Sequence, residues 1–303
     1  MFRARWFVAL AMGAVLAVGC ARTSPDGSSQ EIPSSPPQRI VSLAPSITET
    51  LFALGVGDRV VGVTRYCAFP PAAHDLPRVG GHLDPNIEAI VSLEPDLVMV
   101  IPSSHENRRR LEALGIRVLE VDQHDVDSVL ASISVVADVC GVPERGRELR
   151  TEIEGQLQRI SDRVAGANHP RVLVVVGHQV GDDAVRSVWA AGPDTFYDGV
   201  VRVAGGVNAV DSGPASYPEL SREGLAAVDP DVVIDVIAGL EERDLTIGAV
   251  RAGWRRLAEL RAVRENRVVV LEGDHMVIPG PRLPEMVEAI ARALHPALNW
   301  GPE

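Results

Sequence analysis

The sequence predicts an α/β fold with two Rossmann-like lobes, each built on a parallel sheet, joined by one long spanning α-helix, with a ligand cleft between the lobes. Three observations predict this fold. Short β-rich runs alternate with helical patterns from Arg39 onward, as in parallel sheets with crossover helices. A single long helical stretch over residues 143–167 interrupts this alternation. The segments before and after that stretch resemble each other in order.

The first lobe is predicted over residues 39–142. Its expected strands lie at 40–43, 60–63, 97–101 and 117–121, and two expected helices lie at about 104–115 and 126–140. A further helix should follow the first strand, because Ser46 and Glu49 have the spacing of a capping box. Strand and helix therefore alternate as parallel pairing requires.

The spanning helix is predicted over residues 143–167. Pro143 suits the first turn of a helix, where its missing N–H costs nothing. Apolar residues then recur at spacings of 4, 4, 3 and 4, namely Leu149, Ile153, Leu157, Ile160 and Val164. They form one stripe on a helix that would be roughly 35 Å long, the width of a domain. The second lobe is predicted over residues 168–303, beginning with a strand at 172–176.

The two lobes repeat each other in sequence. Residues 87–98 match residues 222–233 at an offset of 135, including a glutamate, the apolar positions and an acid-Pro-Asp turn. Two further matches keep the same order, 39–41 with 171–173 and 117–119 with 267–269. Any two strand–helix units share some likeness, but three ordered matches favour two homologous lobes.

The N-terminus is expected to direct export and to carry a lipid. Residues 1–19 combine Arg3 and Arg5 with an apolar run that ends in small residues before Cys20, the pattern of a bacterial lipoprotein signal peptide. An ordinary signal peptide with a chance cysteine, or a membrane anchor, remains the alternative. Residues 20–38 are rich in Ser, Pro and Gly and are predicted to form a disordered tether. The expected location is the periplasm or the outer face of the plasma membrane, with lipid anchoring.

Composition excludes several function classes. The net charge is −12 and all 29 Lys and Arg positions are Arg, with no basic run longer than the three arginines 108–110, which argues against nucleic-acid binding. No apolar stretch of membrane-spanning length follows the first twenty residues. Motifs such as G-x-S-x-G, Walker A, C-x-x-C and H-E-x-x-H are missing, so neither an enzyme nor a resident cofactor is predicted. A disulfide between Cys67 and Cys140 is left open.

Candidate ligand-binding residues follow the predicted strands, because ligands bind at the carboxyl ends of parallel strands. They are Pro45, Ser46, Tyr66, His82, Trp189, Tyr217, Asp274, His275, Met276, Val277 and Ile278. Aromatic side chains with polar groups suit a large ring-like ligand. His82, His178 and His275 could also converge on a metal, but no two are close in sequence, so no metal site is predicted.

The chain resembles the helical-backbone (class III) substrate-binding proteins of ABC importers over about residues 39–295. The resemblance rests on R-I-V-S-L-A-P-S-I-T-E (39–49), G-V-T-R-Y-C-A-F-P-P (62–71) and P-N-I-E-A-I (85–90), with A-G-G-V-N (204–208), L-S-R-E (220–223) and G-P-R (280–282) in the second lobe. Within the family it is most similar to members that bind vitamin B12, with haem and ferric-siderophore binders as cousins.

The resemblance implies delivery of a cobalamin-like corrinoid to a permease dimer with its ATPase subunits. The alternatives are haem or a ferric siderophore as ligand, or a metal-dependent enzyme on the same scaffold. The resemblance further implies that Tyr66 and the loop 274–278 contact the ligand, and Arg282 of the matched G-P-R joins that set. Aromatic residues of the B12 binders are partly replaced near His82, Tyr217 and His275, which leaves the ligand less determined than the fold.

Two glutamates are predicted to dock the permease. Family members use one glutamate on each lobe to contact arginines of the permease dimer, and the matching positions here are Glu88 and Glu223. Two equivalent carboxylates suit a twofold partner, since each can accept a bidentate Arg. The simpler alternative is that both are first-turn residues favoured by the helix dipole, worth about 0.3–1 kcal/mol.

Overall fold

The computed structural model describes residues 35–102, 105–181, 184–211, 213, 215–239 and 246–301. The predicted signal peptide, Cys20 and most of the tether lie outside the described residues. The last residues of the predicted tether belong to the folded part: Pro37 is buried, and the backbone N–H of Gln38 donates to Asp96 at 2.7 Å. The folded part therefore begins a few residues before position 39.

The N-terminal lobe (residues 35–142) contains a four-stranded parallel sheet in the order β2-β1-β3-β4. The strands are β1 (Ile40–Ser42), β2 (Val60–Val63), β3 (Leu97–Val100) and β4 (Val118–Glu120), and the α-helices are α1 (Pro45–Ala53), α2 (Ile87–Ser92), α3 (His105–Ala113) and α4 (Val126–Val139). Short 3-10 helices η1 (Gly57–Arg59) and η2 (Pro71–Asp75) complete it. The strands predicted for this lobe are confirmed, each shortened by at most two residues.

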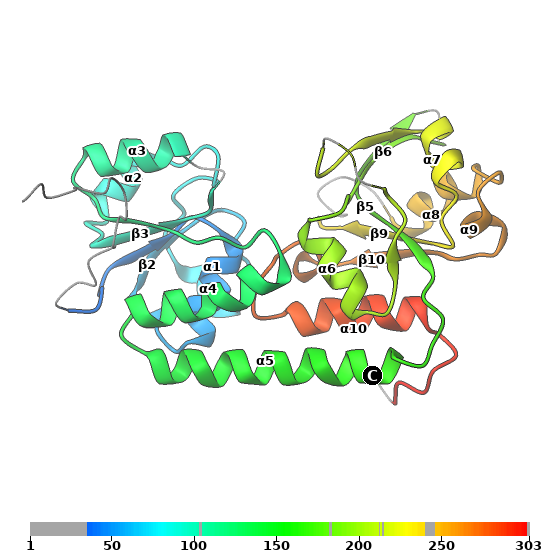
Figure 1. Cartoon of the computed structure of the whole chain (residues 1–303). Helices are drawn as coiled ribbons and strands as arrows, with labels where there is room; N and C mark the ends of the chain where they lie inside the picture. The colour runs from blue at the N-terminus through cyan, green and yellow to red at the C-terminus, as the bar shows by residue number, and fades with distance from the viewer. Residues whose placement is uncertain are drawn as a thin grey trace, which may run out of the picture. The chain divides into compact units, whose positions relative to one another are not determined.

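The spanning helix α5 (Pro143–Val164) begins at the predicted proline. Its apolar stripe, Leu149, Ile153, Leu157, Ile160 and Val164, is buried. The helix packs against both α4 and α10 (Leu283–Leu294), as Figure 1 shows. The stripe belongs to a hydrophobic cluster with members from both lobes, including Ile133 and Leu283. The predicted periodicity therefore marks the face that joins the two lobes.

The C-terminal lobe (residues 168–301) contains a mixed six-stranded sheet rather than a purely parallel one. Its strands are β5 (Arg171–Gly181), β6 (Ala184–Ala190), β7 (Val207–Asn208), β8 (Glu219–Ser221), β9 (Val232–Ile237) and β10 (Val268–Glu272), in the order β10-β9-β5-β6-β8 with β7 paired to β5. Strand β6 runs antiparallel to β5 and β8. The sequence did not predict this hairpin, because the expected strand ended at residue 176, whereas β5 continues to Gly181.

The helices of the C-terminal lobe flank this sheet. They are α6 (Phe196–Val203), α7 (Arg222–Val228), α8 (Ile247–Arg255), α9 (Arg261–Arg264) and α10, with the 3-10 helix η5 (Asp274–Met276) directly after the last strand. Because β5 is longer than the predicted strand at 172–176, His178 lies inside the strand and not beyond its end.

The predicted capping box at the start of α1 is wrong. The N-cap is Ala44, without a side-chain hydrogen bond, because Pro45 occupies the first helical position. Ser46 and Glu49 lie inside the helix and are buried. Their polar groups have distant partners instead: the Ser46 hydroxyl donates to Gln123 Oε1 at 2.6 Å, and Glu49 is paired with Arg282.

The internal repeat is present in three dimensions. Strands β2-β1-β3-β4 of the first lobe correspond in order to β7-β5-β9-β10 of the second. An equivalent arginine also lies at the start of the first strand of each lobe. Arg39 donates to the carbonyl of Leu93 at 2.6 Å, and Arg171 donates to the carbonyl of Val228 at 2.9 Å. Since Leu93 and Val228 are 135 positions apart, the contact follows the offset of the sequence repeat.

Both cysteines of the folded part are separate thiols. Cys67 and Cys140 are buried and free, and desolvation raises the pKa of Cys140 to about 11. Within the described ranges, no helix has the length and apolar character needed to cross a bilayer.

Candidate functional site

Exposed apolar side chains gather in the segments that the sequence singled out. The described residues include ten large hydrophobic side chains that are well exposed, and six of them lie in or beside these segments: Tyr66, Phe69, Leu83, Trp189, Tyr217 and Val277. Three come from each lobe. Exposed apolar groups of this size, when clustered, mark binding surfaces. Phe69 and Leu83 were not among the predicted ligand-binding residues, although both lie within loops that follow β2.

Arg78 holds the loop that carries Tyr66 through two hydrogen bonds. The Nη1 of Arg78 donates to the carbonyl oxygens of Thr64 and Cys67, both at 3.0 Å. These carbonyls flank Tyr66, which is 54% exposed. The loop is therefore held while the tyrosine ring stays open to a ligand. Arg78 itself carries no sequence signal, because its role depends on the path of the loop.

The ring of Tyr66 has a cation on one side and an imidazole on another. The Arg65 guanidinium lies 5.3 Å from the ring centroid, and the His82 ring lies 6.4 Å away in an edge-on arrangement. Arg65 also pairs with Asp84. Because this ion pair is largely exposed, it orders the arginine with little gain in stability.

The predicted residues Pro45 and Ser46 differ in what they can offer. Pro45 is half-buried at the first position of α1, whereas Ser46 is buried and its hydroxyl already donates to Gln123. Ser46 therefore supports the start of α1 and leaves no free hydroxyl for a ligand.

The loop 274–278 alternates between anchored and open residues. Met276 and Ile278 are buried, and the Tyr197 hydroxyl donates to the Met276 carbonyl at 2.8 Å. Val277, in contrast, is 39% exposed, and His275 is half-buried. Met276 and Ile278 therefore fix the loop, and Val277 is the apolar side chain that it presents. Tyr197 was not predicted, since a buried helix residue gives no sign of its partner.

Arg282 is engaged within the protein rather than free for a ligand. Its Nε and Nη2 donate to the two carboxylate oxygens of Glu49 at 2.9 and 2.5 Å, and its Nη1 donates to Asp274 at 3.1 Å. Burial raises the pKa of Glu49, opposed by the bonds from Arg282. Burial alone would raise the pKa of Asp274, but the hydrogen bond and charge of Arg282 lower it.

Trp189 comes from the hairpin that the sequence did not reveal, and Tyr217 lies just before β8, the strand that pairs with it. Trp189 lies on β6 opposite Gly177 of β5, and a Cβ at Gly177 would be 3.3 Å from the indole. Tyr217 precedes β8, the neighbour of β6, and is 43% exposed. Of the four exposed large apolar side chains in the described part of the C-terminal lobe, the added hairpin supplies Trp189, and the segment before β8 supplies Tyr217.

The histidines are not arranged as a metal site. His178 has only 5% of its side chain exposed, and its Nδ1 lies 3.7 Å from Asp235 Oδ1. His82 and His275 lie on different loops of different lobes. Among the described residues, no group of three His, Cys, Asp or Glu side chains is placed to hold a metal ion.

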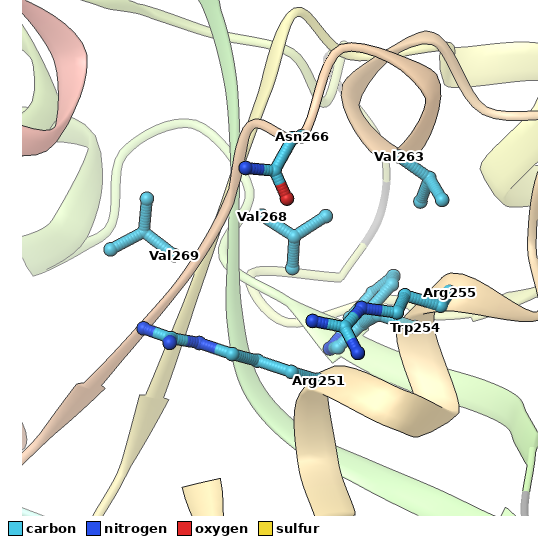
Figure 2. A pocket seen from close by; sticks show the side chains of 7 residues that line it. All are labelled: Arg251, Trp254, Arg255, Val263, Asn266, Val268 and Val269. Atoms are coloured by element: carbon cyan, nitrogen blue, oxygen red, sulfur yellow. The ribbon is translucent and has the colours of Figure 1, made fainter. Parts of the chain in front are cut away.

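Two open pockets lie elsewhere. One of about 320 Å³ is lined by Arg251, Trp254, Arg255 and the start of β10, and Figure 2 shows both arginines extending from α8 along it. Another of about 280 Å³ lies between α5 and α10 beside Trp300. Neither includes a predicted site residue. The candidate site therefore lies outside both of these pockets.

Glu88 and Glu223 occupy equivalent positions. Each lies in the first turn of a short helix, α2 or α7, and each is exposed. The N-caps are Asn86, which accepts from the Ala89 N–H, and Ser221, which accepts from the Gly224 N–H. A backbone hydrogen bond and one from Ser221 lower the pKa of Glu223. Both carboxylates are therefore exposed, and that of Glu223 also accepts from the Ser221 hydroxyl at 2.8 Å.

Comparison with known proteins identifies the family. The profile described as "Periplasmic binding protein" matches residues 40–274. The chain belongs to the periplasmic binding protein family. It is 31% identical over 281 residues to the cobalamin-binding protein of Halobacterium salinarum, covering 90% of this chain and 74% of that protein. It is 28% identical over 322 residues to the uncharacterized ABC transporter substrate-binding lipoprotein YvrC of Bacillus subtilis, covering 97% and 98%.

A solved structure of the family supports the same fold. The periplasmic heme-binding protein BhuT, in complex with two hemes, is 34% identical with a TM-score of 0.72, covering 86% of this chain and 98% of that one. The predicted fold class and the predicted family resemblance are confirmed by these matches. In this periplasmic binding protein, the candidate ligand site consists of the exposed segments at the strand ends of both lobes.

Proposed function

We propose that the chain is an extracytoplasmic substrate-binding lipoprotein that delivers a cobalamin-like corrinoid to an ABC importer. One observation carries the ligand proposal: six of the ten exposed large apolar side chains of the described residues lie at the strand ends of the two lobes. A corrin is a broad ring with apolar faces and a polar edge, and such loops can cover it. The cobalamin-binding relative at 31% identity supports this choice.

The proposed contacts divide into two kinds. Tyr66, Trp189, Tyr217 and Val277, together with the newly found Phe69 and Leu83, would cover the faces of the ring. Pro45, His82, His275 and Asp274 would meet its edge. Ser46, Met276, Ile278 and Arg282 are buried or already bonded, and would hold the contact loops in position.

Titration calorimetry with cobalamin, haem and ferric siderophores tests the ligand. Cobalamin should bind most tightly. Tyr66→Ala should weaken binding by about 1–3 kcal/mol, since an exposed ring that becomes buried by the ligand is lost. Arg150→Ala is the control, because this residue lies on α5 in an exposed ion pair with Glu154 and belongs to none of the candidate segments. Heat from haem and none from cobalamin would contradict the proposal.

Haem is the second candidate, and one observation favours it. The Tyr66 phenol is open to solvent beside the Arg65 guanidinium, and a tyrosine oxygen can serve as a ligand of haem iron. The haem-binding structure at 34% identity supports this candidate. Tyr66→Phe separates the two ligands: it removes the phenol oxygen and should abolish a haem Soret shift, while stacking on a corrin should be nearly unchanged.

We further propose that Glu88 and Glu223 dock the permease of the importer. Both are exposed in corresponding first turns of the two lobes, outside the loops of the candidate ligand site. Reversal of either charge to Arg should leave ligand affinity unchanged and lower uptake, with a larger loss when both are reversed. A double-reversal variant with full transport would leave only the helix-dipole role. Folding stability should fall by no more than about 1 kcal/mol per site.

Lipid anchoring through Cys20 is proposed from the sequence and supported by the lipoprotein name of the Bacillus subtilis relative. Cys20→Ser should release the protein from the membrane fraction or leave it unprocessed. Normal cleavage with unchanged membrane association of this variant would refute lipidation.

A further inference from the structure

Arg282 shares its guanidinium between carboxylates of the two lobes. Nε and Nη2 donate to Glu49 on α1 of the N-terminal lobe, and Nη1 donates to Asp274 on η5 of the C-terminal lobe. Only 13% of the arginine side chain and 2% of the Glu49 side chain are exposed. The pair is thus a bidentate contact shielded from water, the geometry in which such pairs are strongest. The two partners are 233 positions apart in the chain.

A second layer of contacts encloses this pair. The Phe69 ring of the N-terminal lobe lies under the guanidinium, with 4.2 Å between the arginine carbon Cζ and the ring centroid. Gly280 passes against α1, since a Cβ on it would be 3.5 Å from both Glu49 Oε2 and Ser46 Cα. The approach of α1 and the 278–282 segment is therefore close, and the arginine lies at the centre of it.

The C-terminal side of the contact leads directly into the ligand loop. Asp274 Oδ1, which accepts from Arg282, also accepts from the backbone N–H of His275 at 2.6 Å. The loop then closes with two backbone bonds, Met276 N–H to Gly273 and Val277 N–H to Asp274. The position of Val277, the exposed apolar residue of this loop, is thus linked through Asp274 and Arg282 to a carboxylate of the other lobe.

We infer that Glu49 and Arg282 form an inter-lobe clamp that positions the 274–278 loop for its ligand. Arg282 and Glu49 are positioning residues, because their charged groups act through Asp274 and not on the ligand. The inference rests on the proposed function in one respect, that this loop meets the ligand. A purely structural ion pair would stabilise only its own surroundings, whereas the clamp transmits a change at α1 to a loop in the opposite lobe.

Hydrogen exchange of the ligand-free full-length protein tests the clamp without any ligand. Glu49→Gln keeps the shape of the side chain and removes its charge. The amides of Met276 and Val277 should then exchange at least tenfold faster, while those of β9 in the same lobe keep their protection. The matched control is Glu288→Gln, which removes an ion pair with Arg292 inside α10 of one lobe. It should leave the 274–278 loop unchanged.

Two results would overturn the clamp: acceleration limited to α1, or uniform acceleration that includes β9. If Glu49→Gln does not fold, Arg282→Lys replaces it, because lysine keeps the positive charge but cannot bond both carboxylates in this geometry. The same loop-specific acceleration is then expected.

A second measurement asks whether loop position matters to binding. With cobalamin as the probe, Glu49→Gln should release the ligand at least fivefold faster, with an association rate close to wild type. The double variant Glu49→Gln, Arg282→Gln should be no worse than the worse single variant, because the two residues act as one unit. Additive losses would contradict a shared role. If cobalamin binds neither the wild type nor any variant, the ligand proposal fails. The hydrogen-exchange result still decides whether the clamp positions the loop.

Discussion

The two lobes share one plan and differ at its centre. Both have a central strand paired with parallel neighbours in the same order, and both have an arginine bonded to the end of an equivalent helix. At equivalent positions of β3 and β9, however, the N-terminal lobe has Val100 and the C-terminal lobe has Asp235, and both residues are fully buried. The same topology therefore tolerates either an apolar or an acidic residue in its interior, depending on what surrounds it.

The acidic version depends on partners that the N-terminal lobe lacks. The indole N–H of Trp254 on α8 donates to Asp235 Oδ2 at 2.7 Å, and His178 Nδ1 lies 3.7 Å from Oδ1. Desolvation raises the pKa of Asp235, opposed by His178 and Trp254. Val100 packs instead in an apolar cluster with Val41 and Leu111. The added hairpin and this polar cluster occur together in one lobe, since His178 lies on the extension of β5 that pairs with β6.

The largest effect is expected when the acidic residue is placed in the wrong lobe. Val100→Asp introduces a carboxyl group among apolar side chains, and should lower the free energy of unfolding by about 3–5 kcal/mol, the cost of an uncompensated buried charge. Urea denaturation measures it. Val100→Thr, of nearly the same shape and uncharged, is the control and should lose much less. A loss below about 1 kcal/mol for Val100→Asp would show that the two lobes are interchangeable at this position.

The reverse change should cost less. Asp235→Val makes the C-terminal lobe resemble the N-terminal one, but leaves the buried Trp254 N–H without an acceptor. The free energy of unfolding should fall by about 1–3 kcal/mol. Asp235→Asn keeps an acceptor oxygen and should recover most of this loss, with the near-ultraviolet circular dichroism of the indole as a second readout. Wild-type stability of Asp235→Val would mean that the polar cluster contributes nothing to the lobe.

The smallest effect should distinguish the two equivalent arginines. Arg171 is half-buried and bonds the carbonyls of Val228 and Ala209, whereas Arg39 is exposed. Arg171→Gln should therefore lower stability by about 1–2 kcal/mol, and Arg39→Gln by less than about 1 kcal/mol. Thermal unfolding of both variants, beside the surface control Arg110→Gln, measures the difference. Equal losses of stability in the two variants would show that burial of the arginine does not change what its hydrogen bonds contribute.

Local features of the fold could be predicted from the sequence because their signals are local. The strands around Ile40 and Leu97 are short apolar runs between turn residues, and α5 is an unbroken apolar stripe after Pro143. Such periodicity reflects which face of an element is buried, and that is written in neighbouring residues. Glu88 and Glu223 could likewise be paired by their offset alone, since the repeat preserves it.

Partnerships between distant segments could not be predicted in this way. Ser46 and Glu49 have the spacing of a helix cap, yet their groups bond to Gln123 and Arg282. The sequence pattern is satisfied by either arrangement, and only the approach of the 278–282 segment to α1 decides between them. The length of β5 and the hairpin that carries Trp189 could not be predicted either, because the pairing of β5 with β6 is a contact between two separate segments.

The amino-acid sequence by itself determined the repeated lobe plan, the spanning helix and the loops where exposed aromatic side chains occur, because each follows from burial patterns within a few residues. The tertiary structure alone decided which of those loop residues stay open, as Tyr66 and Val277 do, and which are used internally, as Arg282 is. A charged side chain takes whichever partner lies within bonding distance after folding, and for Arg282 that partner is a carboxylate 233 positions away.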